Sequence, residues 1–227
     1  MFVSIPTRQH NQVRWATPLL FALLWAAYLW ASTRPESARR LWLLDWGALT
    51  GGEAIADTFL AVWSQGHWLR LFSALFLHAD WAHLLGNLVF LLIFGLPAER
   101  VMGAGRFLVL FLLGGALANL AAALLMGTPA RSIIGASGGV SAVIGAYLAL
   151  FPGARLGVVV PLGLWLEFIR VPAAVLIGLW AVLQLAFTFV GPNFGAVAWW
   201  AHLAGFCVGA VFALMLRPSL ARRARGL

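Results

Sequence analysis

The sequence predicts an all-α integral membrane protein with six transmembrane helices, on the basis of its composition, its apolar segments and its arginines. Of the 227 residues, 63% are hydrophobic and only 10% are charged, whereas soluble proteins average about 25% charged residues. Crossing ~30 Å of hydrocarbon takes ~20 apolar residues. Six windows approach that length, and they lie at roughly 16–32, 82–97, 107–126, 137–152, 172–190 and 199–216.

The distribution of arginine predicts the orientation of these six spans. All fifteen basic residues are arginine. With the N-terminus inside, the inner segments carry ten of them, namely Arg8, Arg14, Arg100, Arg106, Arg155, Arg170, Arg217, Arg222, Arg223 and Arg225. The outer segments carry the other five, Arg34, Arg39, Arg40, Arg70 and Arg131. Cytoplasmic loops are enriched in basic residues, so we expect both termini in the cytoplasm.

This arginine placement also accounts for the formal charge of +8. A nucleic-acid-binding protein would need basic residues gathered on one soluble face, which this chain does not show. We therefore expect a lipid bilayer as partner and no nucleic acid. Lysine-free composition and the lack of a long targeting segment favour a bacterial plasma membrane, while an organellar membrane remains an alternative.

The chain is expected to form one membrane domain at 16–216, between a short cytoplasmic segment at 1–15 and a basic cytoplasmic tail at 217–227. A tryptophan-rich loop of about fifty residues joins the first two spans, and its mixture of aromatic and sparse charged residues predicts helices at the membrane interface. After the fourth span, PGARLGVVVPLGLWLEFIRVP is interpreted as a cytoplasmic turn with a partly apolar return. Residues 191–200 fit either an outer lid or a plain connector.

The first group of polar residues at the outer end of a span is in HADWAHLLGN. His83 and Asn87 are four residues apart, so they share one face of a helix, and His78 precedes that helix. Polar groups inside an apolar span require partners or a wet cavity. Loop carbonyls could satisfy these histidines. A metal site is a weaker alternative, because neither an HExxH motif nor a matching carboxylate accompanies them.

Ser137 begins the fourth span, within GASGG. The unpaired N–H groups of a first helical turn, together with the positive end of the helix dipole, favour a developing oxyanion. Gly135 and Gly138 allow another backbone to approach closely. Packing of small residues between helices explains the same composition. The segment also fits the G-x-S-x-G elbow of hydrolases, but no strand–helix alternation surrounds it.

The third group lies in AHLAGFCVGA, where Gly205 and Gly209 follow His202 by three and seven residues. One face of the last helix therefore carries a histidine with a glycine groove below it, suited to pack on the helix of Ser137. A serine nucleophile needs a base, and histidine is the usual one. Since no acid lies within any span, a Ser137–His202 dyad is predicted, with His83 and Asn87 donating to the oxyanion. A solute channel or transporter is the rival, weakened by the missing acid and the missing inverted repeat.

These residues resemble the motifs of the rhomboid family of intramembrane serine proteases, from Trp68 to Gly209. The family pattern H-x4-H-x3-N matches His78, His83 and Asn87, and G-x-S-G matches Gly135, Ser137 and Gly138. The pattern A-H-x2-G-x3-G matches Ala201, His202, Gly205 and Gly209. The Trp-Arg motif of the first loop is matched by Arg70, the expected loop anchor, but Leu69 replaces its tryptophan.

The resemblance implies a rhomboid-like six-helix bundle that cleaves transmembrane proteins near their outer ends, without metal or cofactor. It implies Ser137 as nucleophile, His202 as base, His83 and Asn87 in the oxyanion hole, and His78 and Gly138 in support. Gly135, Gly205 and Gly209 would pack helices. Family members often carry an aromatic residue four positions after the serine, where this chain has Ser141. A rhomboid-like protein that binds or escorts membrane helices without cutting them is the alternative.

Overall fold

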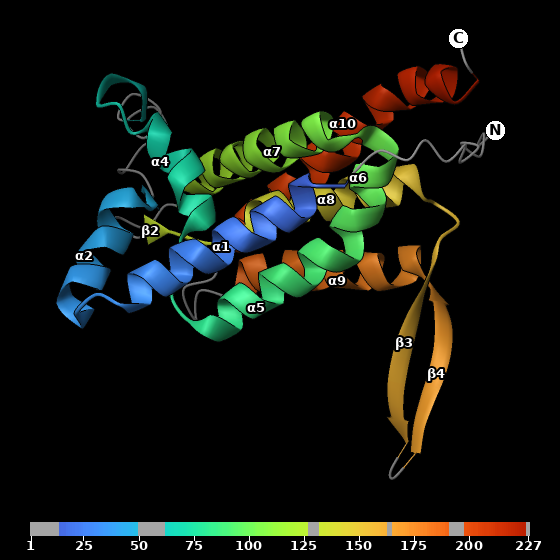
Figure 1. Cartoon of the computed structure of the whole chain (residues 1–227), viewed down its shortest axis with the longest axis horizontal. Helices are drawn as coiled ribbons and strands as arrows, with labels where there is room; N and C mark the ends of the chain where they lie inside the picture. Colours follow the sequence, from blue (N-terminus) through green and yellow to red (C-terminus); the bar gives the residue numbers. More distant parts are fainter. Residues whose placement is uncertain (1–13, 50–61, 127–131, 163–164, 191–197, 226–227) are drawn as a thin grey trace.

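The computed structural model is mostly helical and describes residues 14–49, 62–126, 132–162, 165–190 and 198–225. Its long helices lie side by side, with α2, α4 and β2 at one end of the bundle and the start of α1 and the end of α10 at the other (Figure 1). The helices are α1 (Ala16–Ser32), α2 (Glu36–Trp46), α4 (Trp68–Ser73), α5 (Trp81–Phe90), α6 (Leu96–Met102), α7 (Ala104–Leu125), α8 (Ser137–Leu150), α9 (Ala173–Val190) and α10 (Trp199–Arg225). A 3-10 turn, η1 (Ala74–Phe76), follows α4, and a π-helical turn, η2 (Leu91–Gly95), joins α5 to α6.

Each of the six predicted spans coincides with a helical segment, but the segments differ in length. Within the described residues, four are long and apolar enough to cross a membrane, at 81–102, 104–125, 173–190 and 199–222. The other two apolar helices, α1 and α8, have 17 and 14 residues. At 1.5 Å per residue, α8 is about 21 Å long, which is shorter than the hydrocarbon layer. The chain is a helical, multi-pass membrane protein.

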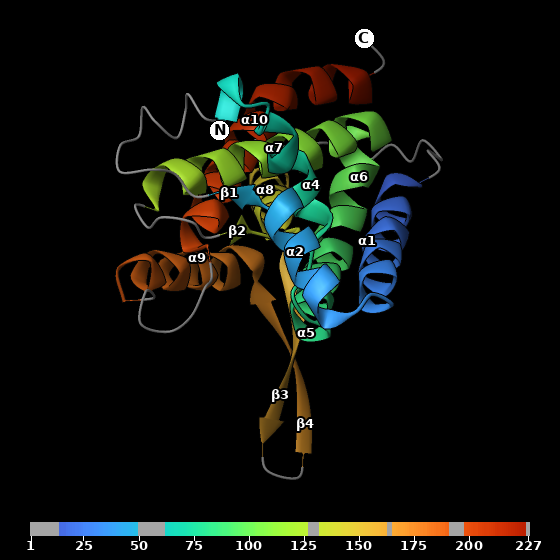
Figure 2. The same ribbon diagram turned by 90° about the vertical axis from the view of Figure 1, so that its left-hand side faces the viewer.

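Helix α8 can be short because other helices surround it. Figure 2 shows it in the middle of the molecule, between α7, α9 and α1. Eleven of its fourteen residues are buried. Its small residues let α10 approach as backbone: a side chain at Gly209 would overlap the carbonyl oxygen of Ala142, and one at Gly145 would overlap that of Phe206. Such close approach of small residues is a main source of helix association in lipid.

The last helix includes described residues of the expected basic tail, 217–227. Helix α10 continues through Pro218 to Arg225, so described residues expected in a separate tail extend the last helix. At the same end, the buried carboxylate of Glu99 accepts hydrogen bonds from the N–H groups of Ala16 and Thr17, at 2.8 and 2.9 Å. These donors have no partner within α1 itself, so Glu99 fastens the first helix to α6. The expected N-terminal segment, 1–15, lies almost wholly outside the described residues.

The expectation of an all-α chain is wrong at residues 155–172. There, β3 (Arg155–Leu162) and β4 (Trp165–Pro172) pair antiparallel, with Arg155 opposite Pro172. This hairpin projects away from the helices at the end of the bundle opposite α2 (Figure 1). Three consecutive β-branched valines, Val158 to Val160, favour a strand over the turn that we predicted. Trp165 and Phe168 are 80% and 77% exposed, so the hairpin presents large apolar side chains outward.

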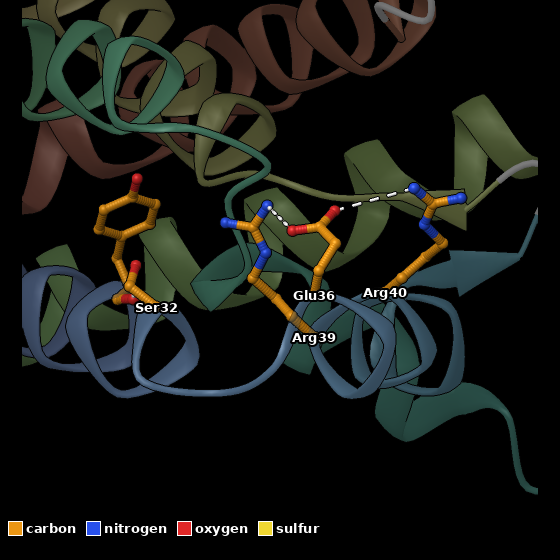
Figure 3. Close-up of polar contacts among 5 residues, drawn as sticks. Ser32, Glu36, Arg39 and Arg40 are labelled. Atoms are coloured by element: carbon orange, nitrogen blue, oxygen red, sulfur yellow. Dashed lines mark hydrogen bonds and ion pairs between the residues drawn. The ribbon is translucent and has the colours of Figure 1, made fainter.

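The tryptophan-rich first loop contains two of the helices, α2 and α4, as far as it is described. Among its exposed side chains are Leu41, Leu44 and Trp46. Glu36 of α2 forms ion pairs with Arg39 at 3.0 Å and Arg40 at 3.8 Å (Figure 3). Such exposed pairs contribute little to stability. The rest of the loop, 50–61, and most of the predicted lid or connector, 191–197, lie outside the described residues.

Candidate active site

The polar residues singled out in the sequence belong to helices that begin at the same end of the bundle. His83 and Asn87 lie in the first two turns of α5, Ser137 is the first residue of α8, and His202 lies in the first turn of α10. A short antiparallel pair of β1 (Ala48–Leu49) and β2 (Ser132–Ile133) crosses this end and joins the first loop to the segment before α8. The structure therefore gathers these side chains from three separate parts of the chain.

They line one cavity of about 880 Å³. Ser137, His202, His83 and Asn87 all contribute to its wall. The remaining lining residues include Arg40 and Leu43 of α2, Asp80, Ile134, Ser141, and Trp180, Gln184 and Trp199 of α9 and α10. The cavity thus combines three serine hydroxyls, two imidazoles and two side-chain amides in a largely apolar bundle. A water-accessible site of this composition suits proton transfer.

Ser137 stands directly after a backbone turn that requires glycine. Gly135 has φ +119°, which side-chain-bearing residues rarely adopt, and its N–H donates to the carbonyl of Ala74 at 2.9 Å. A Cβ on Gly135 would lie 2.6 Å from Nε2 of His83. The first N–H groups of α8 have no acceptor within the helix. Gly135, which we predicted to serve helix packing, leaves room for the His83 ring beside Ser137.

Close packing of α8 and α10 brings the turns of Ser137 and His202 together. A side chain on Gly205, one turn after His202, would overlap the carbonyl oxygen of Gly138, the residue after Ser137. The same Cβ would lie 3.3 Å from Cβ of Ser141. Gly138 in turn lies against Ala118 of α7, where a Cβ would be 2.9 Å from the alanine Cβ. Glycines therefore set the spacing of the two helices at the level of the site.

His78 lies behind the cavity wall and contacts the elements that form it. It is 2% exposed, and its Nε2 is 3.0 Å from Nδ2 of Asn87 and 3.4 Å from the backbone nitrogen of Ala136. Both partners are donors, so Nε2 accepts and carries no proton. Burial, followed by the neighbouring His83, lowers the pKa of His78 to about 3, against opposing effects of the Phe76 backbone and Asp80. His78 is therefore neutral at physiological pH.

His83 is held from its backbone and from one side of its ring. Asp80 caps α5, accepting from the His83 N–H at 2.8 Å. The rings of His78 and His83 meet edge to face with centroids 5.1 Å apart. Sequence reasoning placed His83 and Asn87 on one face, and the structure adds that His78 touches both of them. Its position before the helix did not reveal this contact, because the chain bends at Ala79 and Asp80, between His78 and α5.

Three residues that we did not predict surround His202. Oε1 of Gln184 lies 2.6 Å from Nδ1 of His202. The Trp180 ring stacks at 6.5 Å between centroids and 29° between planes, and Trp199 stands edge-on at 5.8 Å. Gln184 is a polar side chain inside an apolar span, which was the available signal. Sequence could not tell which group it would meet.

Arg70 does not line the cavity. It lies in α4 and is half-buried, and burial together with the nearby Arg70 charge lowers the pKa of His67. Its predicted role as a loop anchor stays a prediction. Within the described residues, no cluster of three or more histidine, cysteine, aspartate or glutamate side chains is arranged to hold a metal ion.

The family model of the Rhomboid domain matches residues 65–219, well over half of the chain. The chain belongs to the rhomboid family. It is 28% identical over 162 residues to the "Putative rhomboid protease YdcA" of Bacillus subtilis (strain 168), covering 70% of this chain and 73% of YdcA. It is 33% identical over 107 residues to "Rhomboid protease GluP" of the same organism, covering 44% of this chain but only 20% of GluP. This rhomboid is thus similar to bacterial proteins named as proteases.

Proposed function

We propose that this rhomboid is an intramembrane serine endopeptidase that cuts transmembrane proteins near the outer side of the membrane. The observation that carries the proposal is the single cavity onto which Ser137, His202, His83 and Asn87 converge. Membership of a family with protease-named bacterial relatives supports it. Six membrane-embedded segments, including the short α1 and α8, and cytoplasmic termini in a bacterial plasma membrane belong to the same proposal.

In the proposed reaction, His202 takes the proton of the Ser137 hydroxyl as Oγ bonds to the carbonyl carbon of the scissile peptide. The negative charge moves onto the carbonyl oxygen, where the Ser137 N–H and the side chains of His83 and Asn87 donate hydrogen bonds. When the C–N bond breaks, His202 gives its proton to the leaving amine. Water, activated in the same way, then releases the acyl group from Ser137.

The short α8 explains how such chemistry could occur inside a membrane. A helix of about 21 Å is too short to cross the hydrocarbon layer. If the C-terminal end of α8 lies at the inner surface of the layer, its first residue does not reach the outer surface. Ser137 would therefore lie within the depth of the bilayer, and the cavity above it would supply water. A scissile bond in an intact substrate helix has its carbonyl engaged, so we expect substrates with helix-weakening residues near the cut. This expectation concerns the substrate class only.

The test is cleavage of a single-span substrate protein in proteoliposomes by the purified chain. We expect Ser137→Ala and His202→Ala to abolish cleavage, and Ser219→Ala, a serine at the opposite end of the bundle, to leave it intact. A fluorophosphonate probe should label the intact chain and not Ser137→Ala. If the chain binds substrate but never cuts it, and Ser137→Ala binds equally well, the alternative of a helix-binding, non-catalytic rhomboid replaces this proposal. Loss of cleavage in Ser141→Ala alone would instead reassign the nucleophile.

A further inference from the structure

The inward stripe of α9 consists of apolar residues with one exception, Gln184. The buried residues of this helix in the described structure are Ala173, Ile177 and Gln184. Their spacing of four and seven residues places them on a single face, while residues such as Val175 and Leu179 are 58% exposed. A side-chain amide within a membrane span is retained where it has a polar partner. Gln184 is 7% exposed, and its partner is His202.

The contact between these two side chains determines which ring nitrogen of His202 carries the proton. Oε1 of Gln184 is a carbonyl oxygen and only accepts, so Nδ1 of His202, 2.6 Å away, donates. A neutral imidazole has one N–H, and Nδ1 holds it. Nε2 is therefore the unprotonated nitrogen, free to take a proton.

Other neighbours restrict the ring but leave its tautomer open. Trp180, one turn before Gln184 on α9, stacks on His202, and Trp199 meets it edge-on. On α8, the position four residues after Ser137 is occupied by the buried Ser141 and not by an aromatic side chain that could stack on the ring. The support of His202 in this chain thus comes from α9 and from the first turn of α10. Aromatic faces constrain the plane of an imidazole, but only the amide distinguishes Nδ1 from Nε2.

We propose that Gln184 is the positioning residue of the general base, a neutral third member behind Ser137 and His202. This inference rests on the proposed function. Gln184 gains and loses no proton: the proton of the Ser137 hydroxyl moves to Nε2 of His202 and then to the leaving amine. Throughout, the other ring proton stays on Nδ1 of His202 and is donated in a hydrogen bond to Oε1 of Gln184. The amide orients the ring as a carboxylate would, without adding a charge in the low-dielectric bundle.

Two substitutions by side chains about as long as glutamine distinguish a role of Gln184 in orienting the His202 ring from a role in packing. Gln184→Met removes both polar groups, and Gln184→Glu keeps an oxygen for the Nδ1 proton. Thr188→Val is the matched control, because the Thr188 hydroxyl, one turn along α9, bonds only to the Leu185 carbonyl of its own helix in the described structure. The other titratable groups lining the cavity, Arg40, Asp80 and His83, are unchanged in all three variants.

We expect Gln184→Met to lower kcat about tenfold or more, with KM within about twofold, since one hydrogen bond to the base is lost. Gln184→Glu should recover most of kcat and move the acidic limb of the kcat/KM profile to higher pH, because a carboxylate stabilises the imidazolium. Thr188→Val should match the intact chain. Packing alone would not produce the shifted profile.

Failure of this inference differs from failure of the proposed function. If Ser137→Ala is inactive but Gln184→Met keeps the kcat and pH profile of the intact chain, Gln184 does not position the base. If no substrate is cut, histidine-labelled protein still decides the assignment by 15N NMR, which separates the two tautomers. The His202 signal should show a protonated Nδ1 in the intact chain and a mixture in Gln184→Met. The same tautomer in both proteins would overturn the inference.

Discussion

The buried imidazole of His78 accepts a hydrogen bond from the side-chain amide of Asn87, across 3.0 Å. Nε2 of the same ring also faces the N–H of Ala136, next to Ser137. One ring nitrogen thereby links the helix that carries the proposed oxyanion donors to the segment that carries the nucleophile. The described parts of α5 and α8 are joined here by a polar contact as well as by packing.

This link predicts a non-additive pair of substitutions. Asn87→Ala should lower kcat about 10²–10³-fold, as the loss of an oxyanion donor does. His78→Phe, which keeps the bulk of the ring, should lower kcat about tenfold because it removes the acceptor that holds the amide. The double variant should be slower than Asn87→Ala by clearly less than the tenfold effect of His78→Phe alone, since the part of that effect that passes through Asn87 is already lost. Steady-state cleavage rates measure all three, and His67→Phe is the control; effects that multiply would refute the coupling.

Stability should fall on acidification because of His78. Its pKa is about 3 in the fold and near 6.5 when unfolded, so only the unfolded chain binds the proton in between. The contribution of His78 to the free energy of unfolding therefore rises with pH across this window. It decreases progressively as the pH falls from about 6.5 towards 3. Between pH 7.5 and 4.5 the loss should be about 3 kcal/mol. Thermal unfolding in detergent would show it, and His78→Phe should flatten the pH dependence.

Gly135→Ala should impair cleavage more than it impairs folding. The substitution strains a φ of +119° and pushes a methyl group against the His83 ring. Gly66→Ala is a matched control, because Gly66 also has positive φ, +72°, but nothing lies within 4 Å of the added carbon. Gly66→Ala should lose about 1 kcal/mol of stability from backbone strain. Gly135→Ala should lose more, because φ +119° lies outside the left-handed helical region and its methyl group also meets the His83 ring. Only Gly135→Ala should lower kcat, by about tenfold or more, as an oxyanion donor is displaced; equal rates in the two variants would contradict this.

Gly209→Ala should destabilise the bundle. Its methyl group would overlap the Ala142 carbonyl, and separating two packed helices costs about 1–3 kcal/mol. Gly178→Ala on α9 adds the same methyl group into open space and should leave the unfolding temperature unchanged or slightly higher. Comparing the two midpoints in one detergent isolates the overlap. A Gly209→Ala midpoint equal to that of Gly178→Ala would show that α8 and α10 separate freely.

The sequence identified the helices well because a membrane span has a strong local signal. The apolar runs are long, and segments with charged residues separate one run from the next. Predicted windows such as 16–32 and 137–152 therefore fall on α1 and α8. The hairpin at 155–172 was missed because both faces of its strands carry apolar residues, which erases the alternation that marks a half-buried strand. Its prolines, Pro161 and Pro172, also favoured a turn.

For the site as well, features encoded within one helix could be predicted from the sequence, whereas contacts between distant segments could not. Spacing within one helix placed His83 with Asn87, and glycine-rich composition placed the turns of Ser137 and His202 at a helix contact. Gln184 and His202 are eighteen residues apart in the sequence, and their pairing depends on how α9 is rotated about its axis relative to α10. Likewise, the His78 contact to Ala136 spans 58 residues. No periodicity within either segment encodes such a pairing.

The main-chain carbonyls of Gly138 and Ala142 lie directly against the glycines of α10. Because this contact is between backbones, a change of side-chain rotamer cannot alter the distance between α8 and α10. Helix α9, with few inward-packed residues, has no such restraint. Motions during turnover should therefore be confined to the α9 side of the molecule. Turnover limited by such motion would slow as the surrounding lipid becomes more viscous, whereas the reactivity of Ser137 towards a small phosphonate would remain nearly constant.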